Sequence, residues 1–209
     1  MNAIQRRGVC LVIAAPSGGG KGAVTQALLQ AETELSLSIS VTTRAPRRDE
    51  QNGVHYHFVD QARFDAMADA GEFLEYARVF GRNHYGTPRT PVQTFLAAGQ
   101  DVIFDVDWQG YHQIRHALPH DVVGVFLLPP SMAELERRLR GRGTDTPAEI
   151  NQRMATARDE ISHWTEFDHV VLNDDFPATV AAVRAILLAA RLRTERQPGL
   201  ADFVARLSD

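Results

Sequence analysis

The chain has 209 residues, of which 44% are hydrophobic and 23% charged, a composition typical of one soluble globular domain with a full core. Its net charge of −4 at pH 7 argues against a general nucleic-acid binder, which would carry a basic surplus. The chain contains no apolar run of about 18 residues and no signal-peptide pattern, so we expect a cytoplasmic protein without membrane contact.

The strongest local pattern lies near the N-terminus, where an apolar, mostly β-branched run at residues 9–13 predicts a strand buried on both faces. Cys10 lies inside this run, which favours a buried reduced thiol over a nucleophile. From Lys21 onward, apolar residues recur with the spacing of a helix, at Val24, Ala27, Leu28 and Ala31. The turn between strand and helix is rich in glycine and consists of Ala15, Pro16, Ser17, Gly18, Gly19 and Gly20.

A strand, a glycine-rich turn and a helix that begins with lysine predict a phosphate-binding loop. Glycines let successive backbone N–H groups converge, and the N-terminus of the helix adds partial positive charge. We expect Lys21 to lie where a β or γ phosphate binds. The alternative is an ordinary glycine-rich turn, but the spacing matches G-x-x-x-x-G-K-[ST] at Gly20 and Lys21.

Two positions depart from that pattern. Ala15 replaces the first glycine and is small enough to fit. Gly22 replaces the final Ser or Thr, whose hydroxyl normally ligates Mg²⁺. We expect Thr25, one turn further on, to be too distant to replace that hydroxyl directly.

The middle of the chain is rich in predicted strands. Residues 36–42 alternate between apolar and polar side chains, which predicts one half-exposed strand. Residues 54–59 predict a second strand, Asp60 caps a short helix, and residues 73–80 predict a further strand. We interpret residues 36–87 as a small inserted domain.

The second half of the chain alternates between helices and strands. Pro88 suits the first turn of a helix, and the apolar runs at 102–106 and 122–128 predict central parallel strands. Capping boxes at 131–134 and 146–149 predict the starts of two more helices.

The C-terminal part adds a short strand at 170–172 and a closing helix with Val180, Val183, Leu187 and Ala190 on its inner face. After the break at Pro198, a terminal helix carries an apolar stripe at Leu200, Phe203, Val204 and Leu207. That stripe covers either this chain's own core or a second copy, so a homo-oligomer through this segment is possible. The alternation of strands and helices predicts an α/β fold of three layers.

Asp105 and Asp107 follow the predicted strand at 102–106. The carboxyl ends of parallel strands form the ligand-binding edge of such a sheet, and an aspartate there can hold a nucleotide-bound Mg²⁺ or its waters. Capping of a turn or helix is the alternative role for both residues.

Several longer motifs occur in a fixed order along the chain. The pattern S-x-T-T-R-x-x-R-x-x-E-x-x-G-x-x-Y runs from Ser40 to Tyr56, through Arg44, Arg47 and Glu50. The others are F-L-E at 73–75, Y-G-T at 85–87, D-V-D-W-Q-G at 105–110, R-L-R-G-R-G-T at 138–144 and L-N-D-D at 172–175. With these motifs, about residues 8–195 resemble the guanylate kinase family, whose members phosphorylate GMP at the expense of ATP.

The resemblance implies a fold and an organisation. It implies a three-layer α/β/α parallel sheet of the P-loop kinase type, with one guanylate-kinase-like domain over residues 1–209. The core would comprise 1–35, 88–130 and 154–209, the GMP-binding insertion 36–87, and a helical lid 131–153. The substrates it implies are GMP or dGMP and ATP, with Mg²⁺ as cofactor.

The resemblance also implies roles for site residues. The clamp on the GMP phosphate would be Arg44, Arg47, Tyr56 and Tyr85, and the guanine pocket Ser40, Glu75, Thr87 and Asp107. Glu50, Asp105 and Arg153 would also belong to the GMP site. On the ATP side it implies the phosphate-binding loop from Ala15 to Gly22, with Arg138, Arg142 and Asn173. The catalytic residues would be Lys21, Arg44, Arg142 and Arg153, and Asp105 would hold the metal through water.

Two other functions fit parts of the sequence. A catalytically inactive interaction module of this family would bind partners through the same cleft, but such modules usually lose the lysine and the lid arginines that are present here. A kinase for another phosphorylated small molecule could use the same scaffold, although the intact signature from Ser40 to Tyr56 disfavours it.

Overall fold

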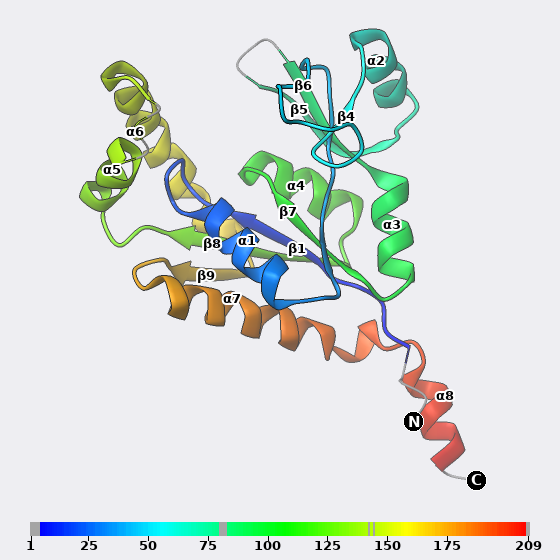
Figure 1. Ribbon diagram of the computed structural model, residues 1–209. Helices are drawn as coiled ribbons and strands as arrows, with labels where there is room; N and C mark the ends of the chain where they lie inside the picture. Colours follow the sequence, from blue (N-terminus) through cyan, green and yellow to red (C-terminus); the bar gives the residue numbers. More distant parts are fainter. Residues whose placement is uncertain (1–4, 80–82, 142, 144, 208–209) are drawn as a thin grey trace.

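The computed structural model describes residues 5–79, 83–141, 143 and 145–207 (Figure 1). In this part of the chain, five parallel strands form the core sheet in the order β2-β7-β1-β8-β9. Their bounds are β1 Cys10–Ala14, β2 Leu35–Leu37, β7 Asp101–Asp105, β8 Val122–Leu128 and β9 His169–Leu172. Because all five run the same way, their carboxyl ends meet at one edge of the sheet.

Alternate residues of β1 enter two separate cores. Leu11 and Ile13 pack with the helices α1 (Lys21–Ala31) and α7 (Phe176–Arg191). Val12 packs on the opposite side with α3 (Arg89–Ala97) and α4 (Trp108–Ala117). Helices therefore cover both faces of the sheet, which confirms the predicted three-layer α/β/α architecture.

The buried face of α1 differs slightly from the predicted stripe. Val24 and Leu28 are buried as expected, but Ala31 is exposed and Thr25 is buried in its place. The next residue, Glu32, is buried because its carboxylate binds Arg184 and Arg191 of α7 at 2.6 Å each. The end of α1 is thus held by ion pairs rather than by its apolar stripe.

A second, smaller sheet stands above the carboxyl edge of the first (Figure 1). It has the order β4-β3-β6-β5, and its bounds are β3 Val41–Thr42, β4 His57–Phe58, β5 Phe73–Val79 and β6 Asn83–Pro88. Helix α2 (Gln61–Asp69) packs on it through Phe64 and Met67, and the predicted cap is present, since Asp60 accepts from the N–H of Arg63.

The single strand predicted at 36–42 is wrong, because the segment belongs to two sheets. Leu35–Leu37 pairs with β7 in the core sheet, whereas Val41–Thr42 pairs with β4 and β6 in the second sheet. An alternating pattern indicates extended chain, but it carries no information about which neighbour accepts the hydrogen bonds.

Two helices form an arm beside the core, α5 (Met132–Gly141) and α6 (Pro147–Ser162), followed by the short 3₁₀ helix η1 (His163–Glu166) (Figure 1). The capping box at Thr146 is complete, because its hydroxyl and the Glu149 carboxylate each bind the other's backbone N–H. At the start of α5, Ser131 accepts from the N–H of Glu134, but the Glu134 carboxylate turns to Arg137 and Arg138 instead.

The two ends of the described chain meet at the amino edge of the core sheet. The N–H of Arg7 donates to the carbonyl of Arg196 at 2.7 Å, in the short 3₁₀ helix η2 (Thr194–Arg196). Helix α8 (Leu200–Leu207) then projects from the body, and none of its residues is buried (Figure 1). Among the described residues, no helix combines the length and the apolar character needed to cross a membrane.

Candidate active site

The predicted phosphate-binding loop connects β1 to α1 and requires glycine at two positions. Gly18 and Gly20 have φ values of +89° and +92°, in the left-handed region that other residues rarely adopt. A Cβ on Gly20 would also lie 2.4 Å from Nδ2 of Asn173. The loop is therefore both conformationally restricted and closely packed.

Lys21 lies at the carboxyl edge of the core sheet. Its Nζ is 2.8 Å from Oδ1 of Asp105 and donates to the carbonyl of Val106 at 2.8 Å. Asp105 is the last residue of β7 and lies in register with Ile13 of β1. The predicted lysine and the predicted aspartate are therefore in contact, because β1, which leads through the loop to Lys21, lies beside β7, which ends at Asp105.

Asn173 supports the loop from the other side. It is buried at 4% exposure, and its Nδ2 donates to the carbonyl of Gly19 at 2.7 Å. Arg138 of α5 donates to the backbone carbonyl of Asn173 at 3.0 Å. The structure thus brings two predicted ATP-side residues to the loop, with the Asn173 side chain holding the loop backbone.

Helix α6 also reaches the loop, at Ser17. Arg153 donates to Oγ of Ser17 at 2.9 Å and forms an ion pair of 3.2 Å with Asp145. The backbone N–H of Ser17 donates to Oε2 of Glu160 at 3.0 Å. Sequence reasoning missed Glu160, since it is one of several charged residues on α6 and no local pattern distinguishes it.

The second sheet gathers another set of predicted residues around Arg44. Its guanidinium donates to both oxygens of Glu50, at 2.8 and 2.9 Å, and to the hydroxyl of Tyr85 at 3.2 Å. It also lies 5.4 Å from the ring centroid of Tyr56. Hydrogen bonding to Arg44 lowers the pKa of Glu50 to about 2, and the same bond raises the pKa of Arg44. The backbone N–H of Arg47 binds Glu50 too, while the Arg47 side chain is exposed.

Glu75 is a nearly buried carboxylate of the same sheet, with 7% exposure. Its burial raises its pKa, which the hydrogen bond from Thr87, at 2.7 Å, opposes in part. The charge of Asp107 raises the pKa of Glu75 further. Asp107 is exposed and accepts from the N–H of Gly110 as the N-cap of α4, so it has a capping role whether or not it also binds a ligand.

A hollow of about 140 Å³ opens between the two sheets. It brings together four predicted residues from different elements, which are Ser40, Tyr56, Thr87 and Asp105. Of the other predicted residues, Arg142 lies outside the described part of the chain.

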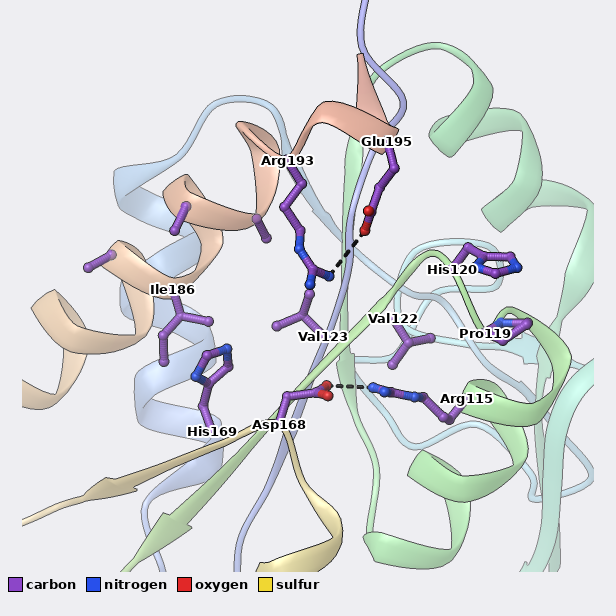
Figure 2. A pocket seen from close by; sticks show the side chains of 13 residues that line it. Arg115, Pro119, His120, Val122, Val123, Asp168, His169, Ile186, Arg193 and Glu195 are labelled. Carbon is purple, nitrogen blue, oxygen red and sulfur yellow. Dashed lines mark hydrogen bonds and ion pairs between the residues drawn. The ribbon is translucent and has the colours of Figure 1, made fainter. Parts of the chain in front are cut away.

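A larger hollow, of about 710 Å³, lies at the opposite, amino edge of the core sheet, beside the starts of β8 and β9 (Figure 2). Both of its arginines are paired with carboxylates, Arg115 with Asp168 and Arg193 with Glu195. None of the predicted site residues lines it. Size therefore does not identify the candidate site, whereas the chemistry at the carboxyl edge does.

A glycine-rich loop follows a buried parallel strand, and a lysine begins the next helix. These features define the fold as that of a P-loop kinase. The family model for guanylate kinase matches residues 7–190. The chain is 61% identical over 202 residues to the guanylate kinase of Granulibacter bethesdensis, covering 97% of this chain and 94% of that protein. It is 56% identical to the guanylate kinase of Gluconobacter oxydans over the full length of both.

A solved structure agrees with the sequence comparisons. The crystal structure of guanylate kinase from Anaplasma phagocytophilum is 36% identical and superposes with a TM-score of 0.76, covering 96% of this chain and 95% of that one. The chain belongs to the guanylate kinase family, and it is therefore a kinase.

Proposed function

We propose that this protein transfers the terminal phosphoryl group of ATP to GMP or dGMP, forming ADP and the nucleoside diphosphate. The observation that carries the proposal is the hollow between the sheets, which Tyr56 and Thr87 line together with Asp105, the partner of Lys21. A substrate held there would lie next to the phosphate-binding loop. In-line phosphoryl transfer depends mainly on such positioning of two reactants and on neutralising their charge.

The residues around Arg44 would hold the GMP phosphate. Arginine binds phosphate oxygens in pairs, and the Glu50 carboxylate keeps the Arg44 guanidinium in one orientation. The Tyr56 and Tyr85 rings lie 5.9 Å apart beside it, and the exposed Arg47 could close over the phosphate from outside.

Glu75 and Asp107 would recognise guanine, with Ser40 and Thr87 beside them. Guanine presents N1–H and N2–H₂ donors that a carboxylate accepts, whereas N1 of adenine is itself an acceptor. The buried Glu75 carboxylate accepts a hydrogen bond from the Thr87 hydroxyl, and an ionised carboxylate can accept several. A bound guanine would supply donors that Thr87 alone does not.

The phosphates of ATP would bind in the loop from Ala15 to Gly22, at backbone N–H groups other than that of Ser17, which donates to Glu160. The charge on the phosphoryl group in transit would be neutralised by Lys21, Arg44, Arg142 and Arg153. Arg138 lies on α5, in the same helical arm as Arg153. Asn173 lies near the expected adenine side, where its grip on Gly19 keeps the loop in shape. No side chain needs to act as a strong base in this reaction.

The residues present fit a Mg²⁺ ion held mainly by its substrate. No group of three or more His, Cys, Asp or Glu suited to a metal occurs in the described ranges, and Asp105, with a side chain 44% exposed, is the carboxylate beside Lys21. Gly22 offers no hydroxyl, and Thr25 is buried. Asp105 would therefore hold the ion through water, with the phosphate oxygens as its other ligands. The ion would neutralise phosphate charge.

The predicted range 36–87, without Ser36 and Leu37, which belong to β2 of the core sheet, would form the GMP-binding unit, and residues 131–153 would form the lid. Closure of both over the carboxyl edge of the sheet would exclude water and complete the site. The proposed reaction belongs in the cytoplasm, with the nucleotides that are its substrates.

A coupled assay of ADP release with GMP, dGMP, AMP and IMP tests this function. We expect turnover with GMP and dGMP and little with the other two. Binding without turnover would support the inactive interaction module instead, and turnover with a different phosphorylated acceptor would support the kinase of other specificity.

A further inference from the structure

Two side chains of opposite charge on α6 contact a single residue of the phosphate-binding loop. Arg153 donates to the hydroxyl of Ser17 at 2.9 Å, and Glu160 accepts from its backbone N–H at 3.0 Å. The helical arm therefore contacts the loop at Ser17, through both the side chain and the backbone of that residue.

The spacing along α6 explains how both groups reach that point. Ile150, Arg153, Ala157 and Glu160 are separated by steps of three and four residues, so they share one face of the helix. Ile150 and Ala157 are buried at 4% and 0% exposure, and α6 packs on α5, so this face of α6 is covered and fixed in direction. Arg153 and Glu160, about two turns apart, are thereby held over the loop.

Electrostatics makes the position of Glu160 unexpected. A carboxylate beside a loop that binds phosphates disfavours anion binding, so its presence requires a compensating role. Its partner is a loop N–H outside any helix or strand, which needs an acceptor to hold its direction. Arg153, which contacts the same residue Ser17, supplies the positive charge that balances the Glu160 carboxylate.

We propose that Glu160 is a positioning residue that acts through Ser17, and this inference rests on the proposed function. It holds the loop in the shape that receives ATP before the nucleotide arrives.

The test compares Glu160→Ala and Glu160→Gln with Asp159→Ala, an exposed neighbour on the same helix. The dissociation constant of ATP is measured by calorimetry without GMP, and kcat and KM are measured for each substrate. Loss of a hydrogen bond to a charged group predicts about a 10-fold or larger rise in the ATP dissociation constant for Glu160→Ala. The amide oxygen of Glu160→Gln still accepts from the N–H of Ser17, so we expect a rise of only about 3-fold in the ATP dissociation constant of this variant. Asp159→Ala should match the parent, and KM for GMP should not change.

Glu160→Asp serves if the alanine variant does not fold, because its shorter carboxylate keeps the charge but does not reach Ser17. It should weaken ATP binding as the alanine variant does. Unchanged ATP binding in both would overturn the proposal, as would equal losses for ATP and GMP that track a lower melting temperature. If the parent chain binds ATP but does not phosphorylate GMP, the proposed function fails while the calorimetry still decides the role of Glu160. A parent chain that does not bind ATP overturns both.

Discussion

At the scale of single residues, Glu75 shows how burial prepares a side chain for recognition. Its pKa is raised by burial, so the folded protein binds this proton more tightly than the unfolded chain does. The favourable contribution to stability is therefore complete below the unfolded pKa of 4.5 and is lost as pH rises through the higher folded value. An ionised Glu75 is therefore a destabilising charge in the folded protein, and we attribute its retention to the proposed recognition of guanine.

Glu75→Gln should separate stability from specificity. The free energy of unfolding at neutral pH should stay the same or rise, because an uncharged amide is cheaper to bury and its oxygen still accepts from Thr87. The preference for GMP over AMP, expected at about 10⁴-fold, should narrow because an amide both donates and accepts. Ratios of kcat/KM and thermal melts measure the two effects, with the exposed Glu72→Gln as control. Equal rates of the parent with AMP and GMP would contradict the assignment of the pocket.

Gly22 is the other residue with a specific expectation. A Cβ built there meets no atom of the described residues within 4 Å, so a serine fits the protein. Gly22→Ser should lower the Mg²⁺ concentration for half-maximal rate, by up to about 10- to 100-fold if the hydroxyl becomes a ligand. It should also raise the melting temperature slightly, since glycine in a helix costs roughly 0.5–1 kcal/mol relative to alanine.

The measurement is a Mg²⁺ titration of the rate at saturating ATP and GMP, with Gly22→Ala as the matched control. The alanine variant should gain the stability without the change in Mg²⁺ requirement. A serine variant that needs as much Mg²⁺ as the parent would show that the missing hydroxyl is not a missing ligand.

At the scale of elements, the loop from Arg44 to Glu50 is organised by one carboxylate. Glu50 accepts from the Arg44 guanidinium and from the Arg47 backbone, so it closes the loop on itself. Its folded pKa of about 2 lies below the ordinary value of 4.5. The stabilisation is therefore present above the unfolded pKa and is lost as pH falls from about 4.5 to about 2.

Glu50→Gln should remove that pH dependence from the loop. Relative to the parent, the variant should lose stability at neutral pH, and the difference should shrink as pH falls through the window from about 4.5 to about 2. Urea unfolding curves recorded across this range measure the difference, with the exposed Asp49→Asn as control. A gap between parent and Glu50→Gln that stays constant with pH would refute the role of the carboxylate.

At the scale of the whole molecule, the second sheet and the helical arm project from the core sheet at separate places, while α8 leaves the body at the other end (Figure 1). Phe203 and Leu207 of α8 are 37% and 69% exposed. Of the two partners considered for the apolar stripe of α8, a second copy of the chain is therefore the one to test. A helix with one apolar face commonly packs that face against a partner.

If a second copy of the chain covers the stripe, removal of residues 198–209 should convert the oligomer into a monomer. The cut leaves Arg196 in place, so its buried hydrogen bond to the Gly8 carbonyl at 3.0 Å is kept. Light scattering of the full chain and of the truncated chain measures the mass, and ATP binding reports that the core is still folded. If the full chain and the truncated chain are both monomers, a second copy of the chain does not cover the apolar stripe.

The sequence by itself determined the elements whose causes are local. The loop from Ala15 to Lys21 and the cap at Thr146 depend on backbone freedom and hydrogen bonds within a few residues, and both formed as predicted. Central strands followed from continuous apolar runs, because a strand covered on both faces needs no polar side. The motif from Ser40 to Tyr56 indicated the family, and it could be recognised in the sequence because its residues lie close together in the chain.

Tertiary structure decided every partnership between distant segments. It split residues 36–42 between two sheets, paired Ser17 with Glu160 across 143 positions and Asn173 with Gly19 across 154. Such bonds depend on where whole helices come to rest, and helix position follows from the packing of many buried side chains together. A charged residue like Glu160 therefore resembles its exposed neighbours in the sequence, and only the packed fold gives it a partner.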